Sequence, residues 1–239
     1  MKVSVIIPAA GASRRFGGKG KKIFQRLRDR PVFVRSVELF VNRDDVCQVQ
    51  LVVAADDMET MKTQHAASIG FMGVQLTAGG AERTDSVRNG LAKVADEADF
   101  VCVHDAVRPC VSSLWIDAAF AAAAKTGAAI LAYPVHGTLK KVSGGRVVAT
   151  ADREGLWEAQ TPQVFRKDIL QAAYAAADGS ATDDAALVEA TGQPVAVVPG
   201  DPRNIKITTA SDLALAAAVI GSLPKPKRAA SGPFDEARW

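Results

Sequence analysis

Residues 3–22 read VSVIIPAAGASRRFGGKGKK, an apolar run that leads directly into a loop of small and basic residues. The first five residues are rich in β-branched side chains, which predicts a short buried strand. Four glycines in the remainder keep side chains away and permit positive φ, so backbone N–H groups can turn toward a ligand. Such a loop after the first strand is where an α/β protein holds a phosphorylated ligand.

Positive charge is concentrated in this loop and in the residues that follow it. Between Arg14 and Arg30 there are eight basic residues and one acidic residue, Asp29, in a chain whose net charge is only +3. The concentration favours a phosphate ligand, although a solvated basic loop gives the same pattern. The loop lacks both the Walker spacing and the G-x-G-x-x-G dinucleotide pattern, so a nucleotide must be bound in another way. The low net charge argues against nonspecific binding of nucleic acid over the whole protein surface.

Composition predicts a globular α/β protein. The chain has 239 residues, of which 48% are hydrophobic and 6% aromatic, enough for one large domain or two small ones. Its three cysteines show no C-x-x-C spacing, which favours a reducing cytoplasm. No apolar run approaches the ~20 residues of a membrane span. Residues 3–12 resemble a short signal peptide, but Pro8 interrupts them, so a strand and loop are preferred.

Strand-like and helix-like segments alternate along most of the chain. The predicted strands are residues 3–7, 50–54, 73–77, 100–104, 128–135, 194–198 and 204–207, with a β-hairpin at 138–150. Three predicted helices are placed by their range, at 57–68, near 155–159 and at 167–177. The other five are placed by their starts. One begins at Pro31 with Asp29 or Arg30 as cap, one follows Thr84 as cap, one begins at Ser112 or Ser113, one begins at Asp183 with Thr182 as cap, and the last begins with a Thr209–Asp212 capping box.

This alternation predicts a doubly wound, mostly parallel sheet with helices on both faces. One domain is expected over residues 1–222, with an arm at about 136–154 and a flexible tail at 223–239. Three unusual loops, at 8–22, 78–83 and 105–109, each follow a predicted strand. Because ligands of such folds bind at the carboxyl ends of strands, the three loops together predict a nucleotide-type site.

Several blocks resemble one enzyme family. Pro8–Gly11 followed by Arg14-Arg15 is similar to the opening signature of Rossmann-like nucleotidyltransferases, and His104–Pro109 narrows the resemblance to cytidylyltransferases. Residues 152–163 and 204–208 resemble the 2-C-methyl-D-erythritol 4-phosphate cytidylyltransferases. The blocks occur in the family's order and spacing over about residues 3–220.

The resemblance implies that CTP and methylerythritol phosphate are joined with release of pyrophosphate, in the non-mevalonate isoprenoid pathway. It also implies Mg²⁺ or another divalent cation as cofactor, and a cytoplasmic homodimer without nucleic-acid or membrane partners. In the family the arm is exchanged across a two-fold dimer, so some substrate contacts come from the partner subunit.

The resemblance further implies the site residues. The nucleotide would be bound by Pro8, Ala9, Ala10, Gly11, Gly79, Gly80, Arg83, Ser86, Asp105 and Ala106, with Gly79, Gly80 and Ser86 at the cytosine edge. The catalytic cations would be Arg15, Lys22 and Lys206, and Asp105 would lie by the ribose and the metal. The second substrate would be bound by Arg108, Thr138, Arg153, Thr161 and Lys206.

The sequence departs from the family pattern at three places. The family's Pro-Lys-Gln is Lys21-Lys22-Ile23, so Lys22 aligns best with the triphosphate lysine, but Lys19 or Lys21 can take its place. Ala81 stands where Asp is frequent and removes one contact to the base. Gly137 replaces a frequent Asp before Thr138.

The implied chemistry needs no general base, because a phosphate monoester with a second pKa of ~6 is largely ionised at neutral pH. Catalysis then requires positioning and cations that neutralise developing charge. His104 is expected to be a packed histidine and Cys102 a core residue. Three alternatives stay open: a ribitol 5-phosphate cytidylyltransferase, a noncatalytic nucleotide-binding regulator, and an RNA-binding module in which Phe16 and Phe24 stack on bases.

Overall fold

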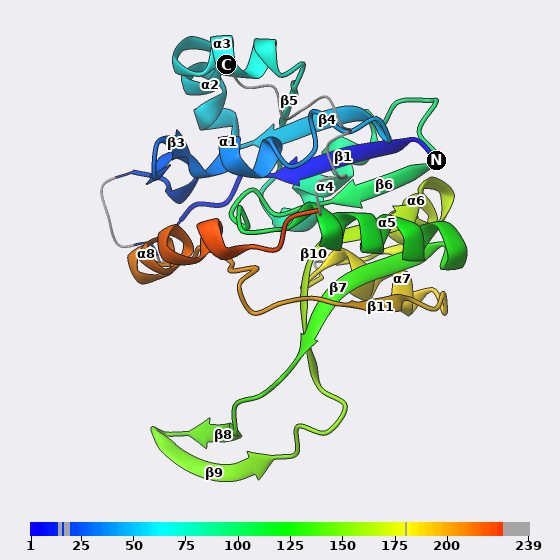
Figure 1. The fold of residues 1–239 in the computed structure, drawn as a ribbon. Helices are drawn as coiled ribbons and strands as arrows, with labels where there is room; N and C mark the ends of the chain where they lie inside the picture. The colour runs from blue at the N-terminus through cyan, green and yellow to red at the C-terminus, as the bar shows by residue number, and fades with distance from the viewer. Residues whose placement is uncertain (14–15, 17–19, 180, 227–239) are drawn as a thin grey trace, which may run out of the picture.

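The computed structural model describes residues 1–13, 16, 20–179 and 181–226, and Figure 1 shows their arrangement. Arg14, Arg15 and Lys19 lie outside these residues, as does most of the predicted tail, residues 227–239. At the start of that tail, the Ser112 hydroxyl donates a hydrogen bond to the Pro224 carbonyl at 2.6 Å. No helix of the described part is both long and apolar enough to cross a membrane.

A seven-stranded sheet forms the centre of the molecule, in the order β11-β7-β10-β6-β1-β4-β5. The strands are β1 (Val3–Pro8), β4 (Val46–Val53), β5 (Gln75–Ala78), β6 (Phe100–Val103), β7 (Ala128–Pro134), β10 (Trp157–Arg166) and β11 (Ala196–Pro199). Only β10 among these strands runs antiparallel to its neighbours, β6 and β7. The predicted doubly wound, mostly parallel α/β sheet is therefore confirmed.

Helices cover both faces of the sheet (Figure 1). They are α1 (Val32–Val37), α2 (Met58–Gln64), α3 (Ala66–Phe71), α4 (Arg83–Leu91), α5 (Ser113–Thr126), α6 (Lys167–Ala176), α7 (Asp184–Ala190) and α8 (Ala210–Val219). Successive strand residues point to opposite faces. Val5 and Ile7 accordingly join the core under α1, α5 and α8, whereas Ile6 joins the core under α4, α6 and α7. Both faces of β1 are buried, which explains its continuous apolar sequence.

Two predicted elements are wrong. The helix expected near 155–159 is instead the start of β10, because the backbone from Trp157 pairs with β7 and, further along, with β6. Pairing of Trp157–Ala159 with β7 overrides the local helical preference of this stretch. The strand expected at 204–207 is irregular chain, fixed by a hydrogen bond from the Ile207 amide to the Val107 carbonyl at 2.8 Å.

Some of the predicted helix caps agree with the structure and others do not. The predicted Thr209–Asp212 capping box of α8 is confirmed. Helix α4, however, starts from Glu82, whose side chain forms a capping box with Asp85, and not from Thr84. The residue before α1 is Pro31, and neither Asp29 nor Arg30 caps that helix.

The helix predicted at 57–68 is interrupted at His65, which separates α2 from α3. Helix α7 starts after Asp183, whose carboxylate accepts a hydrogen bond from the Ala186 amide. Short 3₁₀ helices fill several connections: η1 (Lys22–Phe24), η2 (Ala55–Asp57) and η3 (Ile220–Ser222). A two-residue ladder of β2 (Arg26–Leu27) and β3 (Arg30–Pro31) connects η1 to α1.

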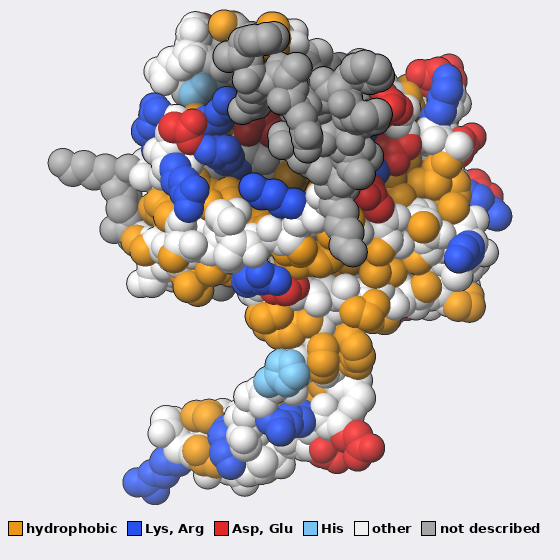
Figure 2. Space-filling model, viewed as in Figure 1, with side chains coloured by type: hydrophobic (Ala, Val, Ile, Leu, Met, Phe, Trp, Pro, Cys, Tyr) orange, Lys and Arg blue, Asp and Glu red, His pale blue; other side chains and the backbone are white. Residues whose placement is uncertain are grey.

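The predicted hairpin is confirmed as an arm of β8 (Leu139–Ser143) and β9 (Arg146–Ala151). Its turn uses Gly144 and Gly145 at φ 56° and 75°, a region that glycine adopts readily. Figures 1 and 2 show the arm projecting from the body of the molecule. Its apolar side chains are open to solvent: Val142, Val147 and Val148 are 61–63% exposed.

Candidate active site

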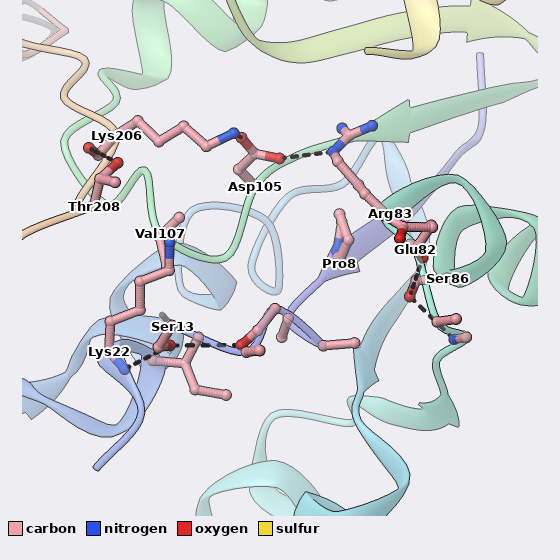
Figure 3. A pocket seen from close by; sticks show the side chains of 17 residues that line it. Pro8, Ser13, Lys22, Glu82, Arg83, Ser86, Asp105, Val107, Lys206 and Thr208 are labelled. Carbon is pink, nitrogen blue, oxygen red and sulfur yellow. Dashed lines mark hydrogen bonds and ion pairs between the residues drawn. The ribbon is translucent and has the colours of Figure 1, made fainter. Parts of the chain in front are cut away.

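A cavity of about 430 Å³ opens at the carboxyl ends of β1 and β6, beside the start of α4 (Figure 3). Most of the residues predicted from the three loops line it. The lining consists of Pro8, Ala9, Ala10, Gly11, Ala12, Ser13, Lys22, Ile23, Gly80, Ala81, Glu82, Arg83, Ser86, Asp105, Val107, Lys206 and Thr208. The structure thus brings Lys22 and Lys206 together with the glycine-rich loop, although 184 positions separate them in the sequence.

The loops after β1 and β5 are in close contact. A Cβ atom on Gly79 would lie 2.7 Å from the Ala10 Cβ and 2.8 Å from the Ser86 Oγ. The Gly80 amide donates a hydrogen bond to that same Ser86 hydroxyl at 3.2 Å. Glycine at position 79 is therefore required by a close approach, and this approach forms one wall of the cavity.

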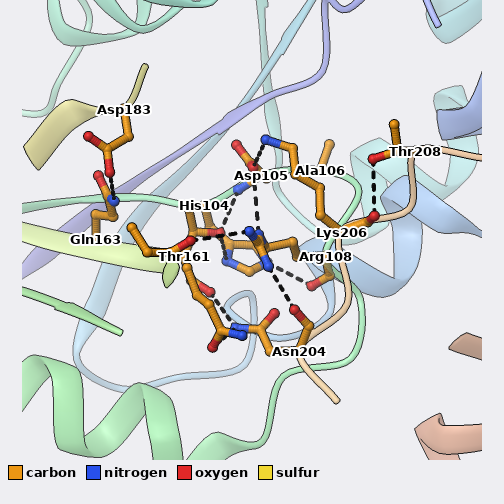
Figure 4. A network of polar contacts seen from close by, with 12 residues as sticks. His104, Asp105, Ala106, Arg108, Thr161, Gln163, Asp183, Asn204, Lys206 and Thr208 are labelled. Atoms are coloured by element: carbon orange, nitrogen blue, oxygen red, sulfur yellow. Dashed lines mark hydrogen bonds and ion pairs between the residues drawn. The ribbon is translucent and has the colours of Figure 1, made fainter. Parts of the chain in front are cut away.

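Asp105 is the centre of a charged network (Figure 4). Its Oδ2 lies 2.7 Å from Lys206 Nζ and its Oδ1 lies 3.3 Å from Arg83 Nε. A third cation, Arg108, lies 3.7 Å away. Burial favours the neutral acid, but the charges of Arg83, Lys206 and Arg108 outweigh it and hold the pKa of Asp105 well below its usual value. The carboxylate is ionised at any pH at which the protein works.

A second cavity, of about 220 Å³, shares three residues with the first: Arg83, Asp105 and Lys206. The predicted substrate residues Arg108 and Thr161 also line it. The remaining lining residues, which the site prediction did not include, are Ala159, Gln160, Gln163, Thr182 and Asp183. The glutamines stand within the quoted block 152–163, which is the signal that could have identified them, whereas Thr182 and Asp183 reach this cavity only through the fold.

Polar residues behind Asp105 fix its backbone (Figure 4). The Asp105 amide donates to Thr161 Oγ1 at 3.1 Å, and that hydroxyl also contacts His104 Nδ1 at 3.1 Å. The other ring nitrogen of His104 contacts the Arg108 carbonyl at 3.0 Å. Burial lowers the pKa of His104 to about 4, so the ring is neutral at pH 7. The expectation of a packed histidine is confirmed, and buried Cys102 is likewise a core residue.

Arg83 connects the site to a buried carboxylate. Its Nη2 lies 2.7 Å from an oxygen of Asp184, a residue without solvent exposure. The other oxygen of Asp184 accepts a hydrogen bond from the Tyr174 hydroxyl at 2.5 Å. Arg83 is therefore held between two aspartates, and its guanidinium is already engaged beside Asp105.

Two predicted nucleotide residues lie next to the first cavity without lining it. Gly79 packs behind Gly80, and buried Ala106 follows Asp105. The predicted Thr138 and Arg153 lie on the arm, where both are exposed, and Arg153 donates a hydrogen bond to the His136 carbonyl. Within one chain, Thr138 and Arg153 are not among the described residues that line the two cavities. Arg15 lies outside the described residues.

The basic stretch 14–30 is not a continuous cationic surface over its described residues. Arg26 donates to the Asp29 carbonyl, Arg28 donates to the Ala217 carbonyl at 3.1 Å, and Arg30 pairs with Glu38. Both aromatic side chains proposed to stack on RNA pack against other residues of the protein. Phe16 is buried in the core, and the ring of Phe24 stacks on His65 at a centroid distance of 5.6 Å. The RNA-binding alternative therefore has no stacking surface at these two positions.

No group of three or more His, Cys, Asp or Glu side chains in the described part of the chain could hold a metal ion by itself. The acidic group shared by the two cavities is Asp105. Mg²⁺ is commonly held by one or two carboxylates together with substrate phosphates and water. A single carboxylate beside the glycine-rich loop fits that mode.

Comparison with known proteins agrees with this geometry. The family model described as "IspD: 2-C-methyl-D-erythritol 4-phosphate cytidylyltransferase" matches residues 3–222. A relative of that name from Rhodopirellula baltica is 42% identical over 230 residues, covering 91% of this chain and 94% of the relative. Another from Symbiobacterium thermophilum is 46% identical over 220 residues, covering 90% and 91%.

Solved structures agree as well. A crystal structure of 4-diphosphocytidyl-2C-methyl-D-erythritol synthase aligns with a TM-score of 0.79 at 34% identity, covering 92% of this chain and 98% of the other. The 2-C-methyl-D-erythritol 4-phosphate cytidylyltransferase from Thermus thermophilus aligns with a TM-score of 0.78 at 34% identity, covering 92% and 100%. The chain therefore belongs to the 2-C-methyl-D-erythritol 4-phosphate cytidylyltransferase family of nucleotidyltransferases.

Proposed function

We propose that this chain transfers the cytidylyl group of CTP to 2-C-methyl-D-erythritol 4-phosphate and releases pyrophosphate. The observation that carries the proposal is the shared wall of the two cavities, where Asp105, Lys206 and Arg83 stand between a nucleotide-sized space and a smaller polar one. Family membership supplies the identity of the two substrates. The product, 4-diphosphocytidyl-2-C-methyl-D-erythritol, places the reaction in the non-mevalonate route to isoprenoid precursors.

CTP is proposed to occupy the larger cavity. The triphosphate lies along the backbone of residues 8–13, where small side chains let the main chain approach it closely. Lys22 and, from outside the described residues, Arg15 neutralise its charge. The base lies by Gly79, Gly80 and Ser86, where the loops after β1 and β5 are in close contact.

The second substrate is proposed to occupy the smaller cavity, with its phosphate toward Lys206. Thr161 and Arg108 line this side. An oxygen of the methylerythritol phosphate attacks the α-phosphorus of CTP and forms the new P–O bond, while the bond from that phosphorus to the bridging oxygen breaks. Pyrophosphate leaves with the electron pair.

No side chain needs to remove a proton in this step, because the attacking phosphate is already ionised. The difficulty is the approach of two anions, so the protein contributes positioning and positive charge. Lys206 is suited to this task because its ammonium stands where the two cavities meet. His104 takes no part as a base, since it is buried and neutral and its ring contacts Arg108 and Thr161.

Mg²⁺ is the proposed cofactor, held by Asp105 together with phosphate oxygens of the nucleotide. When bound, it would neutralise phosphate charge and so favour the leaving pyrophosphate. The ionised state of Asp105 fits this role. Lys206 and Arg83 hold the same carboxylate in place in the unliganded protein.

The working form is proposed to be a homodimer in a reducing cytoplasm. The arm makes its strand pairing within itself and carries exposed valines, an arrangement suited to packing against a second chain. Exchange of the arms would bring Thr138 and Arg153 of one chain to the smaller cavity of the other. The three cysteines are free, which is consistent with a reducing compartment.

A direct assay tests the function. Purified protein is incubated with CTP, Mg²⁺ and methylerythritol phosphate, and pyrophosphate and the diphosphocytidyl product are measured. Ribitol 5-phosphate replaces the acceptor in a parallel reaction. Turnover with ribitol phosphate alone would assign the alternative cytidylyltransferase activity. CTP binding without turnover of either acceptor would identify a noncatalytic nucleotide-binding regulator.

A further inference from the structure

An ion pair links the end of the glycine-rich loop to the segment that follows the neighbouring strand, β4. Lys21 Nζ lies 2.7 Å from Oδ2 of Asp57. Lys21 immediately precedes η1, and Asp57 ends η2, the 3₁₀ turn that follows β4. Because β1 and β4 pair in parallel, with Pro8 opposite Val52, the segments after both strands leave the same edge of the sheet. The pair therefore spans two loops at the edge where the larger cavity opens.

The Asp57 carboxylate is only 9% exposed, so its charge requires a partner. Asp57 directly precedes α2, a position at which an aspartate commonly caps its own helix. Its carboxylate forms an ion pair with Lys21 and makes no capping hydrogen bond to α2. A buried acid that is diverted from its local partner to a residue 36 positions away indicates a tertiary role.

The same ion pair gives two adjacent lysines different positions. Lys21 has an extended backbone, with φ −79° and ψ 141°, whereas Lys22 is the first residue of η1. Lys21 reaches Asp57, whereas Lys22 lines the cavity. The backbone of Lys22 is held from the other side as well, because its N–H donates to Ser13 Oγ at 3.1 Å.

Phe16 gives the described part of the loop a further attachment. Phe16 is buried in the core beneath the loop, and its amide donates to the Ser13 carbonyl at 2.9 Å. Ser13 itself lies at φ 54°, a conformation that L side chains adopt at some cost. Glycine loses more conformational freedom on ordering than other residues, so each of these attachments restricts the loop.

We infer that Lys21 and Asp57 are positioning residues for cytidylyl transfer: their ion pair fixes the backbone from which Lys22 enters the nucleotide cavity. The inference rests on the proposed function and adds to it a residue, Asp57, that does not line the larger cavity among its described wall residues. Lys21 acts on the nucleotide through the placement of Lys22 and not through its own charge.

Steady-state kinetics of Lys21→Ala, Asp57→Asn and the double variant test this inference. Each single variant is expected to raise the KM for CTP about tenfold, because a displaced cation contributes less to binding. The KM for methylerythritol phosphate is expected to stay within about twofold, and the double variant to be no worse than either single one. Lys21→Arg is expected to retain the ion pair and near wild-type kinetics.

Asp57→Asn decides between the positioning role and direct contact. If Lys21 bound the triphosphate itself, removing Asp57 would release its ammonium and leave the KM for CTP unchanged or lower, which overturns the inference. Unchanged kinetics of Lys21→Ala would overturn it as well. Lys2→Ala, which breaks the Lys2–Glu97 ion pair at the opposite end of β1, is the matched control and is expected to behave as wild type.

Thermal unfolding of each variant checks that the fold is intact. If Asp57→Asn does not fold, Lys21→Met compared with Lys21→Arg carries the test, because only the latter keeps a charge for Asp57. Failure of the proposed function is recognised separately, as a wild-type protein that lacks turnover. In that case the same variants are compared by their Kd for CTP, and equal values overturn the inference.

Discussion

Lys206 Nζ lies 2.7 Å from Oδ2 of Asp105, so that an exposed lysine and a buried carboxylate meet on the wall between the two cavities. Asp105 keeps Arg83 and Arg108 as further cationic neighbours. Lys206 can therefore interact with a substrate phosphate without leaving the carboxylate uncompensated. The ion pair holds the ammonium in the unliganded protein close to the place where charge develops in the proposed reaction.

Lys206→Ala is expected to lower kcat by about 10²–10³ while leaving the unfolding midpoint close to that of wild type, because one charge-stabilising contact is lost from the transition state. Pyrophosphate release and thermal unfolding are the measurements. Lys125→Ala, at the end of α5, removes an exposed lysine far from both cavities and serves as the control. Unchanged turnover in Lys206→Ala would remove this residue from the reaction.

The proposed exchange of the arms predicts complementation between two defective chains. Lys206→Ala and Arg153→Ala are each expected to be poorly active as homodimers. In a mixed dimer one site lacks both residues and the other has both, so an equal mixture should regain about a quarter of wild-type activity. Activity after mixing and refolding is measured against each variant alone. No gain on mixing would show that Arg153 acts within its own chain or not at all.

Gly79→Ala is expected to raise the KM for CTP about tenfold, because the new methyl group would meet the Ala10 Cβ and Ser86 Oγ at less than 3 Å and push the two loops apart. Steady-state kinetics with CTP varied are the measurement. Gly70→Ala, where a Cβ atom meets nothing within 4 Å, is the control and should leave the KM unchanged. Ala10→Gly in the Gly79→Ala background should restore part of the affinity; no restoration would contradict the steric explanation.

Tyr174→Phe is expected to lower the free energy of unfolding by about 1–3 kcal/mol, because Asp184 loses a hydrogen bond while staying buried. Urea denaturation measures the change. Tyr133→Phe removes a similar hydroxyl–carboxylate bond, to Glu158, at an exposed position, and should cost less than about 0.5 kcal/mol. Equal effects of the two substitutions would show that burial of Asp184 is not the cause.

The buried His104 predicts a pH-dependent stability. Its pKa is about 4 in the folded protein, lowered by burial, and 6.5 ordinarily. Between these values the unfolded chain binds the proton and the folded chain does not, so stability rises with pH. The contribution is complete above pH 6.5 and is lost as the pH falls toward 4, by roughly 3 kcal/mol.

Urea denaturation of the metal-free protein in chelator at several pH values between about 4 and 7.5 measures this slope. His104→Gln should have a shallower slope than wild type, whatever its absolute stability. His136→Gln changes an exposed histidine at the base of the arm and should keep the wild-type slope. An unchanged slope in His104→Gln would assign the pH dependence to other groups.

The sequence was sufficient to predict the order of strands and loops wherever local chemistry determines structure. The apolar run before Pro8 is a strand, and the Gly144-Gly145 turn closes a hairpin. Prediction failed at the start of β10, because the strand conformation of Trp157–Ala159 depends on pairing with β7. Pairing with a distant strand is a property of the assembled sheet, which a local pattern does not contain.

The candidate site shows the same division. Residues carried by quoted motifs, such as Asp105 and Lys206, do converge on one cavity. The roles of Lys21 and Lys22 could not be separated from sequence, because Asp57, which distinguishes them, lies 36 residues away. Thr182 was missed for a related reason: only the fold brings the start of α7 beside Arg83.

The wall that the two cavities have in common has an evolutionary consequence. Under the proposed binding of the two substrates, a substitution at Arg83, Asp105 or Lys206 alters the surroundings of both ligands at once, so selection for a new acceptor cannot act on these positions without disturbing the nucleotide. Lys22, on the nucleotide side, and Thr182, on the acceptor side, each line one cavity only. Changes of acceptor specificity should therefore accumulate at positions like Thr182, while the three common charges persist.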